Sequence, residues 1–320
     1  MKKEKLIKII NNLSEKKIGV VGDLMLDEFI WGDAERISPE APIPVVLVDR
    51  ETFMPGGAAN TANNITSLGG RTFVVGSIGN DKVGDLLCRA LKRNNINTEG
   101  VVIVSNKPTT QKTRIIARSQ QIVRLDREKT DYIKRGTEEK TVKFIESHIE
   151  NWGALIISDY GKGFITPNLA RRIIVLAGKY KKPVIVDTKK SAHARFFKNA
   201  TLITPNLNEA KNITGLEDLK IMGKTIQKRL NCSVLITQGA EGMTLFEGNG
   251  VKHFSSKARE VFDIAGAGDT VAATLALSLA AGASLKEAAV ISNHAAGIVV
   301  GKLGIATVTQ KELKNSLENE

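Results

Sequence analysis

The chain has 320 residues, of which 42% are hydrophobic and 25% are charged; these globular proportions exclude a disordered chain. Its 28 glycines follow no fixed period, which excludes collagen-like order. The only two cysteines, Cys88 and Cys232, lie far apart, so the sequence excludes a disulfide framework and a thiolate zinc site. This cysteine usage predicts a reducing, cytoplasmic location.

The formal net charge is +12, which suits nucleic acid, an anionic membrane or phosphorylated small molecules as ligands. Six lysines lie in the first 17 residues and the other basic residues are interspersed with acids, so no nucleic-acid motif is present. The longest apolar stretch, Val271–Ala281, is too short to cross a membrane. We therefore expect phosphate-bearing small molecules as ligands, with no nucleic acid and no membrane as partner. A merely solvated basic surface is the alternative.

Short β-branched runs alternate with helical periods along the chain. Strands are predicted at Ile18–Gly22, Arg71–Ile78, Ala154–Ser158, Val184–Asp187, Thr201–Ile203 and Val234–Thr237. Helices are predicted at Gly57–Leu68, Asp81–Asn94, Thr137–Glu150, Pro167–Tyr180, Asn206–Thr214, Leu219–Leu230, Gly268–Ala281 and Leu285–Lys302. This alternation predicts an α/β fold whose mostly parallel central sheet carries helices on both faces.

Two segments interrupt the alternation, residues 31–53 and 100–127. The first contains three prolines and then an apolar run, and the second has three short runs, Val101–Val104, Thr110–Ile116 and Gln121–Leu125, with polar residues interleaved. They predict antiparallel strands outside the main sheet, which form a small lid beside a ligand crevice. No linker or repeat divides the chain, so residues 1–320 are expected to form one domain with a lid.

A glycine-rich segment, Asp263–Asp269 (DIAGAGD), stands directly before a strongly apolar helix. Small residues at 265–268 leave backbone N–H groups accessible, and a helix N-terminus carries partial positive charge, so this turn is a candidate anion cradle. Asp269 then falls in the first helical turn, where a carboxylate can accept a proton from a hydroxyl that attacks a phosphoryl group. An ordinary glycine-rich turn with a capping aspartate is the alternative.

Two further segments place small and polar residues beside strand ends. Gly56 and Gly57 allow close backbone approach by a ligand, and Asn60 offers a donor and an acceptor to sugar hydroxyls. Asp23 and Asp27 follow the first strand, at the edge where parallel sheets bind ligands, and either can hold vicinal hydroxyls. A tight turn and ordinary loop acids are the alternatives.

Asn206 and Glu209 stand three residues apart at a predicted helix start and share one face. Such a pair can orient water on Mg²⁺, which keeps several waters in protein sites. A capping box, with Asn206 as the cap, is the alternative.

The order of these segments resembles the ribokinase-like (PfkB) carbohydrate kinases over roughly residues 15–310. Residues 56–60 (GGAAN) look like the family's first signature, residues 263–269 like its second, and Asn206 with Glu209 like its N-x-x-E motif. The resemblance implies a ribokinase-like fold and ATP-dependent phosphorylation of a sugar. A non-catalytic sugar- or nucleotide-binding protein is the remote alternative.

The resemblance also implies roles for individual residues. Asp269 is the expected catalytic base, and the expected anion hole is the backbone of Ala265, Gly266, Ala267 and Gly268. The residues expected to hold the sugar are Asp27, Gly56, Gly57 and Asn60. The residues expected at the nucleotide are Asn206, Glu209, Thr237, Gly239, Gly242 and Asn293. ATP is the expected phosphoryl donor, with Mg²⁺ held through water by Asn206 and Glu209. Asp263 is expected to hold a monovalent cation such as K⁺, although Ile264 and Ala265 replace two threonines common in the family.

A closer resemblance is to the heptose 7-phosphate kinases of the ADP-heptose pathway. It rests on residues 22–27 (GDLMLD), 36–46 (RISPEAPIPVV), 120–126 (QQIVRLD) and 158–163 (SDYGKG). These kinases phosphorylate the anomeric hydroxyl of D-glycero-D-manno-heptose 7-phosphate, for lipopolysaccharide or other surface glycans. Many relatives carry a nucleotidyltransferase domain; because 320 residues leave no room for one, we expect the kinase domain alone, with no nucleotidyltransferase domain. Another sugar or sugar phosphate, such as fructose 6-phosphate or ribose, is the alternative substrate.

A phosphate on the sugar needs cationic partners, and bidentate geometry favours arginine. The candidates in the lid and the strand-end loops are Arg118, Arg124, Lys162 and Lys189. A solvated surface charge is the alternative for each. The lid also offers exposed strand edges, which proteins rarely leave free, so a homodimer through the lid is expected.

Overall fold

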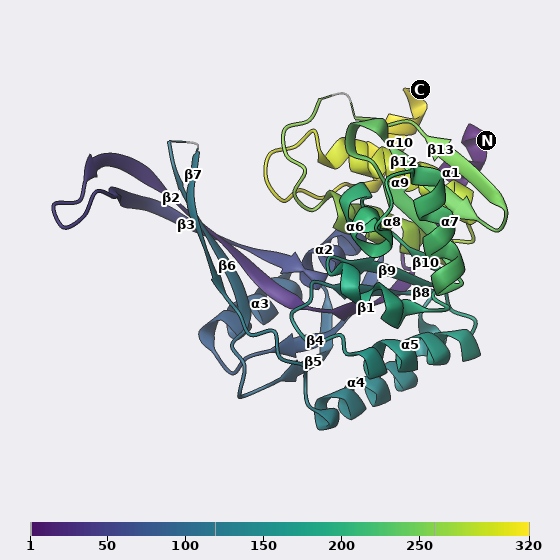
Figure 1. The fold of residues 1–320 in the computed structure, drawn as a ribbon, viewed down its shortest axis with the longest axis horizontal. Helices are drawn as coiled ribbons and strands as arrows, with labels where there is room; N and C mark the ends of the chain where they lie inside the picture. Colours follow the sequence, from purple (N-terminus) through teal and green to yellow (C-terminus); the bar gives the residue numbers. More distant parts are fainter. Residues whose placement is uncertain (1, 119, 259, 320) are drawn as a thin grey trace.

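The computed structural model describes residues 2–118, 120–258 and 260–319. Its main sheet has nine strands, and a second sheet of four strands projects from one side as a long lid (Figure 1). Across the main sheet the strands are β13 (Gly250–Phe254), β12 (Met243–Glu247), β11 (Ser233–Thr237), β10 (Leu202–Ile203), β9 (Val184–Thr188), β8 (Ala154–Asp159), β1 (Lys17–Gly22), β4 (Arg71–Ile78) and β5 (Asn97–Ile103). The predicted α/β architecture is therefore confirmed.

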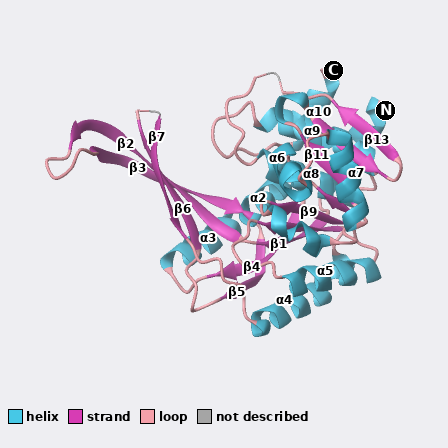
Figure 2. Cartoon of the chain, in the orientation of Figure 1, coloured by secondary structure: helices cyan, strands magenta, loops and turns pink. Residues whose placement is uncertain are grey.

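Successive strand residues point to opposite faces, so each face of the main sheet builds its own core. Val20 lies in one core and Val21 in the other. Figure 2 shows helices flanking the strands of the main sheet, whereas the lid is made of strands. The helices of the first core are α1 (Lys3–Asn11), α2 (Ala58–Ser67), α3 (Lys82–Arg93), α8 (Ala267–Ala280), α9 (Leu285–Val299) and α10 (Gln310–Glu318). Those of the second core are α4 (Arg135–His148), α5 (Pro167–Lys179), α6 (Leu207–Thr214) and α7 (Leu219–Leu230).

The strand direction explains where a ligand can bind. From β11 to β5 the neighbouring strands run parallel, whereas β12 and β13 form an antiparallel extension beyond β11. The chain starts at β1 in the middle of the sheet and moves outward to β4 on one side and to β8 on the other. At such a point the loops beyond the carboxyl ends of the strands diverge and leave a crevice.

The lid is longer than predicted. Its strands, in spatial order, are β3 (Pro44–Gly57), β2 (Leu24–Ile37), β6 (Thr110–Ala117) and β7 (Gln120–Arg127). The pair β2–β3 includes Asp27 and Gly56, which we had placed in loops outside the strands. Because β2 starts two residues after β1 ends, the lid is joined directly to the carboxyl edge of the main sheet.

One predicted lid strand is wrong. The run Val101–Val104 belongs largely to β5, which pairs in parallel with β4 at the edge of the main sheet. An edge strand is only half covered and therefore shows the same polar and apolar alternation as a lid strand. The hairpin β12–β13 and helix α10 were not predicted, and the helix expected to reach Lys302 ends at Val299. Three short 3₁₀ helices cover Ile149–Asn151, Ser191–Phe197 and Gly239–Glu241.

Helix α8 passes through the first core and is buried along most of its length, which explains its continuous apolar sequence. It packs on α2, α9, β8 and β9. Within the described residues, no helix combines the length and the apolar character needed to cross a membrane. The N-terminus of α8 lies at the crevice, and the candidate site is built around it.

Candidate active site

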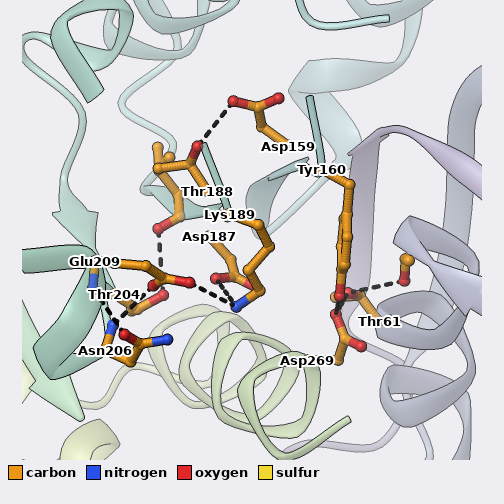
Figure 3. Close-up of polar contacts among 12 residues, drawn as sticks. Thr61, Asp159, Tyr160, Asp187, Thr188, Lys189, Thr204, Asn206, Glu209 and Asp269 are labelled. Carbon is orange, nitrogen blue, oxygen red and sulfur yellow. Dashed lines mark hydrogen bonds and ion pairs between the residues drawn. The ribbon is translucent and has the colours of Figure 1, made fainter. Parts of the chain in front are cut away.

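Asp269, in the first turn of α8, is the centre of the site. Three donors hold its buried carboxylate: the Asn60 amide donates to Oδ2 at 2.7 Å, and the Thr61 and Tyr160 hydroxyls donate to Oδ1 at 2.8 and 3.1 Å. Figure 3 shows the Tyr160 ring reaching the carboxylate opposite Thr61. The contacts come from α2 and from the loop after β8, so three distant segments converge on one group.

The protonation of Asp269 is set by its surroundings. Burial raises the pKa of the carboxyl to about 6, and the nearby Asp187 carboxylate adds to this rise. The Lys189 ammonium and the donors Asn60 and Thr61 act in the opposite direction because they favour the charged form. A carboxylate with a pKa near the working pH can accept and release a proton readily, as a general base must.

The turn before Asp269 leaves backbone donors available to an anion. Gly266 is the N-cap of α8 with φ of +80°, a conformation that favours glycine, and no described side chain caps this helix end. The first four N–H groups of a helix have no carbonyl partner within it. A Cβ on Gly266 would come within 2.9 Å of the Asn60 amide, so the turn also needs glycine for space. The turn thus has the backbone geometry expected of an anion cradle, although the Ala265 N–H already donates to Asp263.

Lys189 lies at the entrance to this cradle. Its ammonium is 2.8 Å from Asp187 Oδ1 and 3.8 Å from Glu209 Oε1, and a Cβ on Gly268 would lie 3.1 Å from its Nζ (Figure 3). Burial alone would lower the pKa of Lys189, but Asp187 and Glu209 outweigh it and raise this pKa. Lys189 thus stays charged beside the turn.

Asp187, at the carboxyl end of β9, has one oxygen to spare. Oδ1 binds Lys189, whereas Oδ2 is buried and has no hydrogen-bond partner among the described residues. A buried carboxylate oxygen without a partner is costly, and it is a natural ligand for a hard cation. No group of three or more His, Cys, Asp or Glu side chains in the described part of the chain forms a ready-made metal site. Mg²⁺ is compatible with such a sparse donor set because it keeps several waters.

Asn206 and Glu209 form a complete capping box at the start of α6, the alternative we left open. Asn206 Oδ1 accepts from the Glu209 N–H and Glu209 Oε2 accepts from the Asn206 N–H, both at 2.8 Å. The cap uses Oε2 and leaves Oε1 facing Lys189. Capping therefore fixes the carboxylate in place toward the site and does not exclude a second role.

A cleft of about 620 Å³ extends from Asp269 along β11 and α9. Asp269 and the glycine-rich turn line this cleft. Every residue predicted at the nucleotide apart from Glu209 lines it too: Asn206, Thr237, Gly239, Gly242 and Asn293. Tyr160 and Lys189, which directly follow β8 and β9, also belong to the lining. Asn293 is anchored, because its amide donates to the Ser255 carbonyl at 2.7 Å. Asp263 stands outside this lining, and its Oδ1 accepts from the Ala265 N–H at 2.8 Å.

The residues predicted at the sugar lie outside the lining of this cleft, at the base of the lid and at the start of α2. Asp27 is buried at the base of the lid, where its Oδ1 accepts from Arg114 of β6. A Cβ on Gly56 would lie 2.0 Å from Asp27 Oδ2, so only glycine fits there. Gly57 has φ of +56° as the N-cap of α2, the helix that carries Asn60. Asn60 links these residues to the cleft because it touches Asp269 directly.

Asp23 does not lie where it can hold a sugar, contrary to one of our expectations. Its carboxylate accepts from the backbone N–H groups of Tyr160, Lys162 and Phe164 at 2.8–3.0 Å. Burial raises its pKa and these three bonds oppose the rise. Asp23 therefore shapes the loop that presents Tyr160 to Asp269.

The four cations predicted for a sugar phosphate are dispersed. Lys189 lies in the cleft with the nucleotide residues, and Lys162 pairs with Glu128 at 2.7 Å. Arg118 is exposed in the turn after β6, with φ of +48°. Arg124 of β7 pairs with Asp126 at 2.9 Å. The structure thus brings together neither the four cations nor any three of them.

Sequence reasoning missed four residues of the site, which are Thr61, Arg114, Tyr160 and Asp187. Tyr160 and Asp187 had a usable signal, because each stands at the carboxyl end of a predicted strand, where ligands bind in parallel sheets. Thr61 follows Asn60 directly. Arg114 had no signal beyond its charge, since its contact with Asp27 depends on the pairing of β2 with β6.

Comparison with known proteins gives consistent matches. The model of the "pfkB family carbohydrate kinase" matches residues 15–312. The "Bifunctional protein HldE" of Desulfatibacillum aliphaticivorans is 43% identical over 318 residues, which are 97% of this chain and 65% of that protein. The protein of the same name from Geobacter sulfurreducens is 43% identical over 305 residues, 93% of this chain and 62% of its own length. The chain thus spans less than two thirds of the length of these curated relatives.

Solved structures match in fold. A putative ribokinase from Agrobacterium tumefaciens superposes with a TM-score of 0.79 at 23% identity, over 96% of this chain and 98% of that one. The Arabidopsis thaliana ribokinase complexed with ribose and ATP gives a TM-score of 0.75 at 21% identity, over 95% of this chain and 99% of the other. The predicted ribokinase-like fold is confirmed.

Proposed function

Since the chain belongs to the pfkB family of carbohydrate kinases, enzymes that transfer a phosphoryl group from ATP to a sugar hydroxyl, we propose that it phosphorylates the anomeric hydroxyl of D-glycero-D-manno-heptose 7-phosphate. The product is the 1,7-bisphosphate, in ADP-heptose biosynthesis. The observation that carries the catalytic part is Asp269, a buried carboxylate that touches the sugar-side Asn60 and stands at an uncapped helix N-terminus.

In the proposed reaction the Asp269 carboxylate accepts the proton of the sugar hydroxyl. The hydroxyl oxygen attacks the γ-phosphorus of ATP, and ADP leaves. The transferring group carries negative charge throughout. The backbone N–H groups of Gly266 and Gly268 and the Lys189 ammonium stand where they can stabilise it, already oriented and partly shielded from water, whereas the Ala265 N–H already donates to Asp263. We therefore reassign Lys189 from the sugar phosphate to the transferring phosphate.

The nucleotide is proposed to occupy the cleft lined by Asn206, Thr237, Gly239, Gly242 and Asn293. Mg²⁺ would be held by Asp187, whose Oδ2 lacks a partner, and by Glu209 through water. It would neutralise charge on the nucleotide phosphates. Asp263 as a monovalent-cation ligand stays a prediction, and the hydrogen bond to Ala265 already uses one of its oxygens.

The sugar is proposed to lie against Asp27, Gly56, Gly57 and Asn60. The heptose identity rests on the four sequence segments that resemble heptose 7-phosphate kinases and on two relatives of the same name at 43% identity. This proposed substrate applies only to the kinase reaction of this chain.

The test is ADP release by the purified protein with heptose 7-phosphate, fructose 6-phosphate and ribose as alternative acceptors. We expect the highest kcat/KM with heptose 7-phosphate. A preference for one of the other sugars would refute the substrate and keep the kinase. Tight sugar binding without ADP release would support a non-catalytic binding protein instead.

We also propose that two copies of the chain pair through the lid. Strands β3 and β7 are its free edges, and the face that carries Glu28 exposes Phe53, Val123 and Leu125, which are 40%, 42% and 54% exposed. Sedimentation at micromolar concentration should give a dimer, and Leu125→Asp should shift it toward a monomer. A monomeric wild-type protein would contradict the proposal.

A further inference from the structure

One face of the lid carries a surplus of cations. Residues directly opposite each other on neighbouring strands share a face, and the register sets Asp27, Lys112 and Asp126 in one row. The next row holds Phe29, Arg114 and Arg124. The hydrogen bonds confirm this arrangement, since Arg114 donates to Asp27 and Lys112 donates to Asp126 at 3.0 Å.

The charges in these two rows do not balance. Among the described residues, Lys112, Arg114 and Arg124 pair with two carboxylates, those of Asp27 and Asp126. Arg114 and Arg124 also stand directly opposite each other, and like charges in that position destabilise a strand pair. A bound anion would relieve this repulsion, and a phosphate monoester carries about two negative charges at pH 7.

Contacts with neighbouring side chains orient the two arginines and the lysine before any ligand binds. The Arg114 guanidinium lies 5.1 Å from the centre of the Phe29 ring and binds Asp27, so its orientation is fixed from two sides. Arg124 makes two bonds to Asp126, through Nε at 2.9 Å and Nη2 at 3.2 Å. The side chains of Lys112 and Arg114 are 13% and 21% exposed, which leaves them reachable and limits their motion.

This face lies on the sugar side of the site. Asp27, which ends the first row, lies directly against Gly56, and the adjacent Gly57 begins α2, whose Asn60 donates to Asp269 at 2.7 Å. Arg114 binds Asp27, Lys112 stands directly opposite Asp27, and Arg124 stands directly opposite Arg114, so the three cations adjoin the sugar-binding Asp27. Resting on the proposed function, we propose that these three side chains form the subsite for the phosphate at the far end of the sugar substrate.

The subsite makes the lid a selector of phosphorylated sugars. Arg114 is predicted to act twice, because it touches both the phosphate and the sugar-binding Asp27. Lys112 and Arg124 act on the phosphate alone. Arg118 at the lid tip, Lys162 paired with Glu128, and Lys189 in the nucleotide cleft lie outside this arrangement.

The test compares kcat/KM for heptose 7-phosphate with kcat/KM for the same heptose without phosphate. Lys112→Gln and Arg124→Gln should each lower the first value about 10- to 100-fold, the usual cost of a lost bond between charged groups, and change the second less than about threefold. Arg124→Lys should recover part of the loss. Arg127→Gln is the matched control, since Arg127 is exposed on the same strand but on the opposite face, near Gln111.

An equal loss on both sugars would overturn the subsite, because the residues would then serve the lid or the sugar ring. No loss on either sugar would overturn it as well. A wild-type enzyme inactive on both heptoses would instead refute the proposed substrate. In that case the same variants measured with fructose 6-phosphate against fructose decide the subsite by the same ratio.

Discussion

The main sheet and the lid hold their charged groups in opposite ways. At the carboxyl edge of the main sheet Asp269 and Asp187 are buried, and fixed donors or Lys189 hold three of their four carboxylate oxygens. On the lid, Arg124 and Asp126 pair with each other and remain partly exposed. Burial makes a charge costly and raises the pKa of Asp269, whereas on the lid the neighbouring Lys112 and Arg124 lower the pKa of Asp126 and keep it charged. Our proposals accordingly assign the chemistry to the first region and the selection of the substrate to the second.

The strongest test of this contrast removes the buried base. Asp269→Asn keeps the shape of the side chain and removes its capacity to accept a proton, so kcat should fall by about 10²–10⁴. ATP affinity, measured by calorimetry, should change little because Asp269 lies at the far end of the cleft. Turnover close to wild type would show that the buried carboxylate is not the base.

The second effect in size concerns the cation at the anion cradle. Lys189→Met removes an ammonium that stands beside Gly268 and should lower kcat by about 10²–10³, the usual loss for one donor to a developing negative charge. Lys190→Met is the matched control, since it is the adjacent lysine and lies outside the cleft lining. If KM for ATP rises while kcat holds, Lys189 only binds the nucleotide, and the reassignment is wrong.

A smaller effect tests Tyr160, which directly follows β8 and lines the cleft beside Asp269. Its hydroxyl donates to Asp269, so Tyr160→Phe removes a bond to the charged form and should raise the pKa of the base further above its ordinary value. In the wild type we expect kcat/KM to fall on the acid side with a midpoint near pH 6. In Tyr160→Phe this midpoint should rise by about one pH unit, and kcat/KM above pH 8 should change little.

Tyr180→Phe is the control for that profile, because Tyr180 ends α5 on the opposite face of the sheet. A merely structural role for Tyr160 would lower activity equally at all pH values. An unshifted acid limb would therefore separate the phenol from the base.

The sequence was sufficient for the parts that depend on local pattern. Alternating strand and helix periods predicted the main sheet, and the glycine-rich turn before an apolar helix predicted the place of Asp269. It was insufficient where the answer depends on which segments meet. Tyr160 reaches Asp269 across 109 residues and Arg114 reaches Asp27 across 87, and no local pattern encodes either contact.

Two errors have the same origin. Strand β5 was assigned to the lid because its alternation reports half-exposure, which an edge strand of either sheet has. Asp23 was a candidate for sugar because it follows a strand, yet its carboxylate holds the loop that ends at Phe164. In both cases the residue types were interpreted correctly and the neighbour was unknown.

The last expected effect is on stability, and it follows from the same burial. Since the folded pKa of Asp269 is about 6 and its ordinary value is 3.8, its ionisation opposes folding above pH 6, and this cost disappears below pH 4. Asp269→Asn should therefore gain stability over wild type at pH 8 relative to pH 4, by up to about 3 kcal/mol in urea unfolding. Asp263→Asn, in the partly exposed turn before it, is the control and should show little such gain. If the difference in unfolding free energy between Asp269→Asn and wild type did not vary with pH, the carboxylate would be charged in the folded protein at no cost. The contrast between the buried site and the exposed lid would then fail at its central residue.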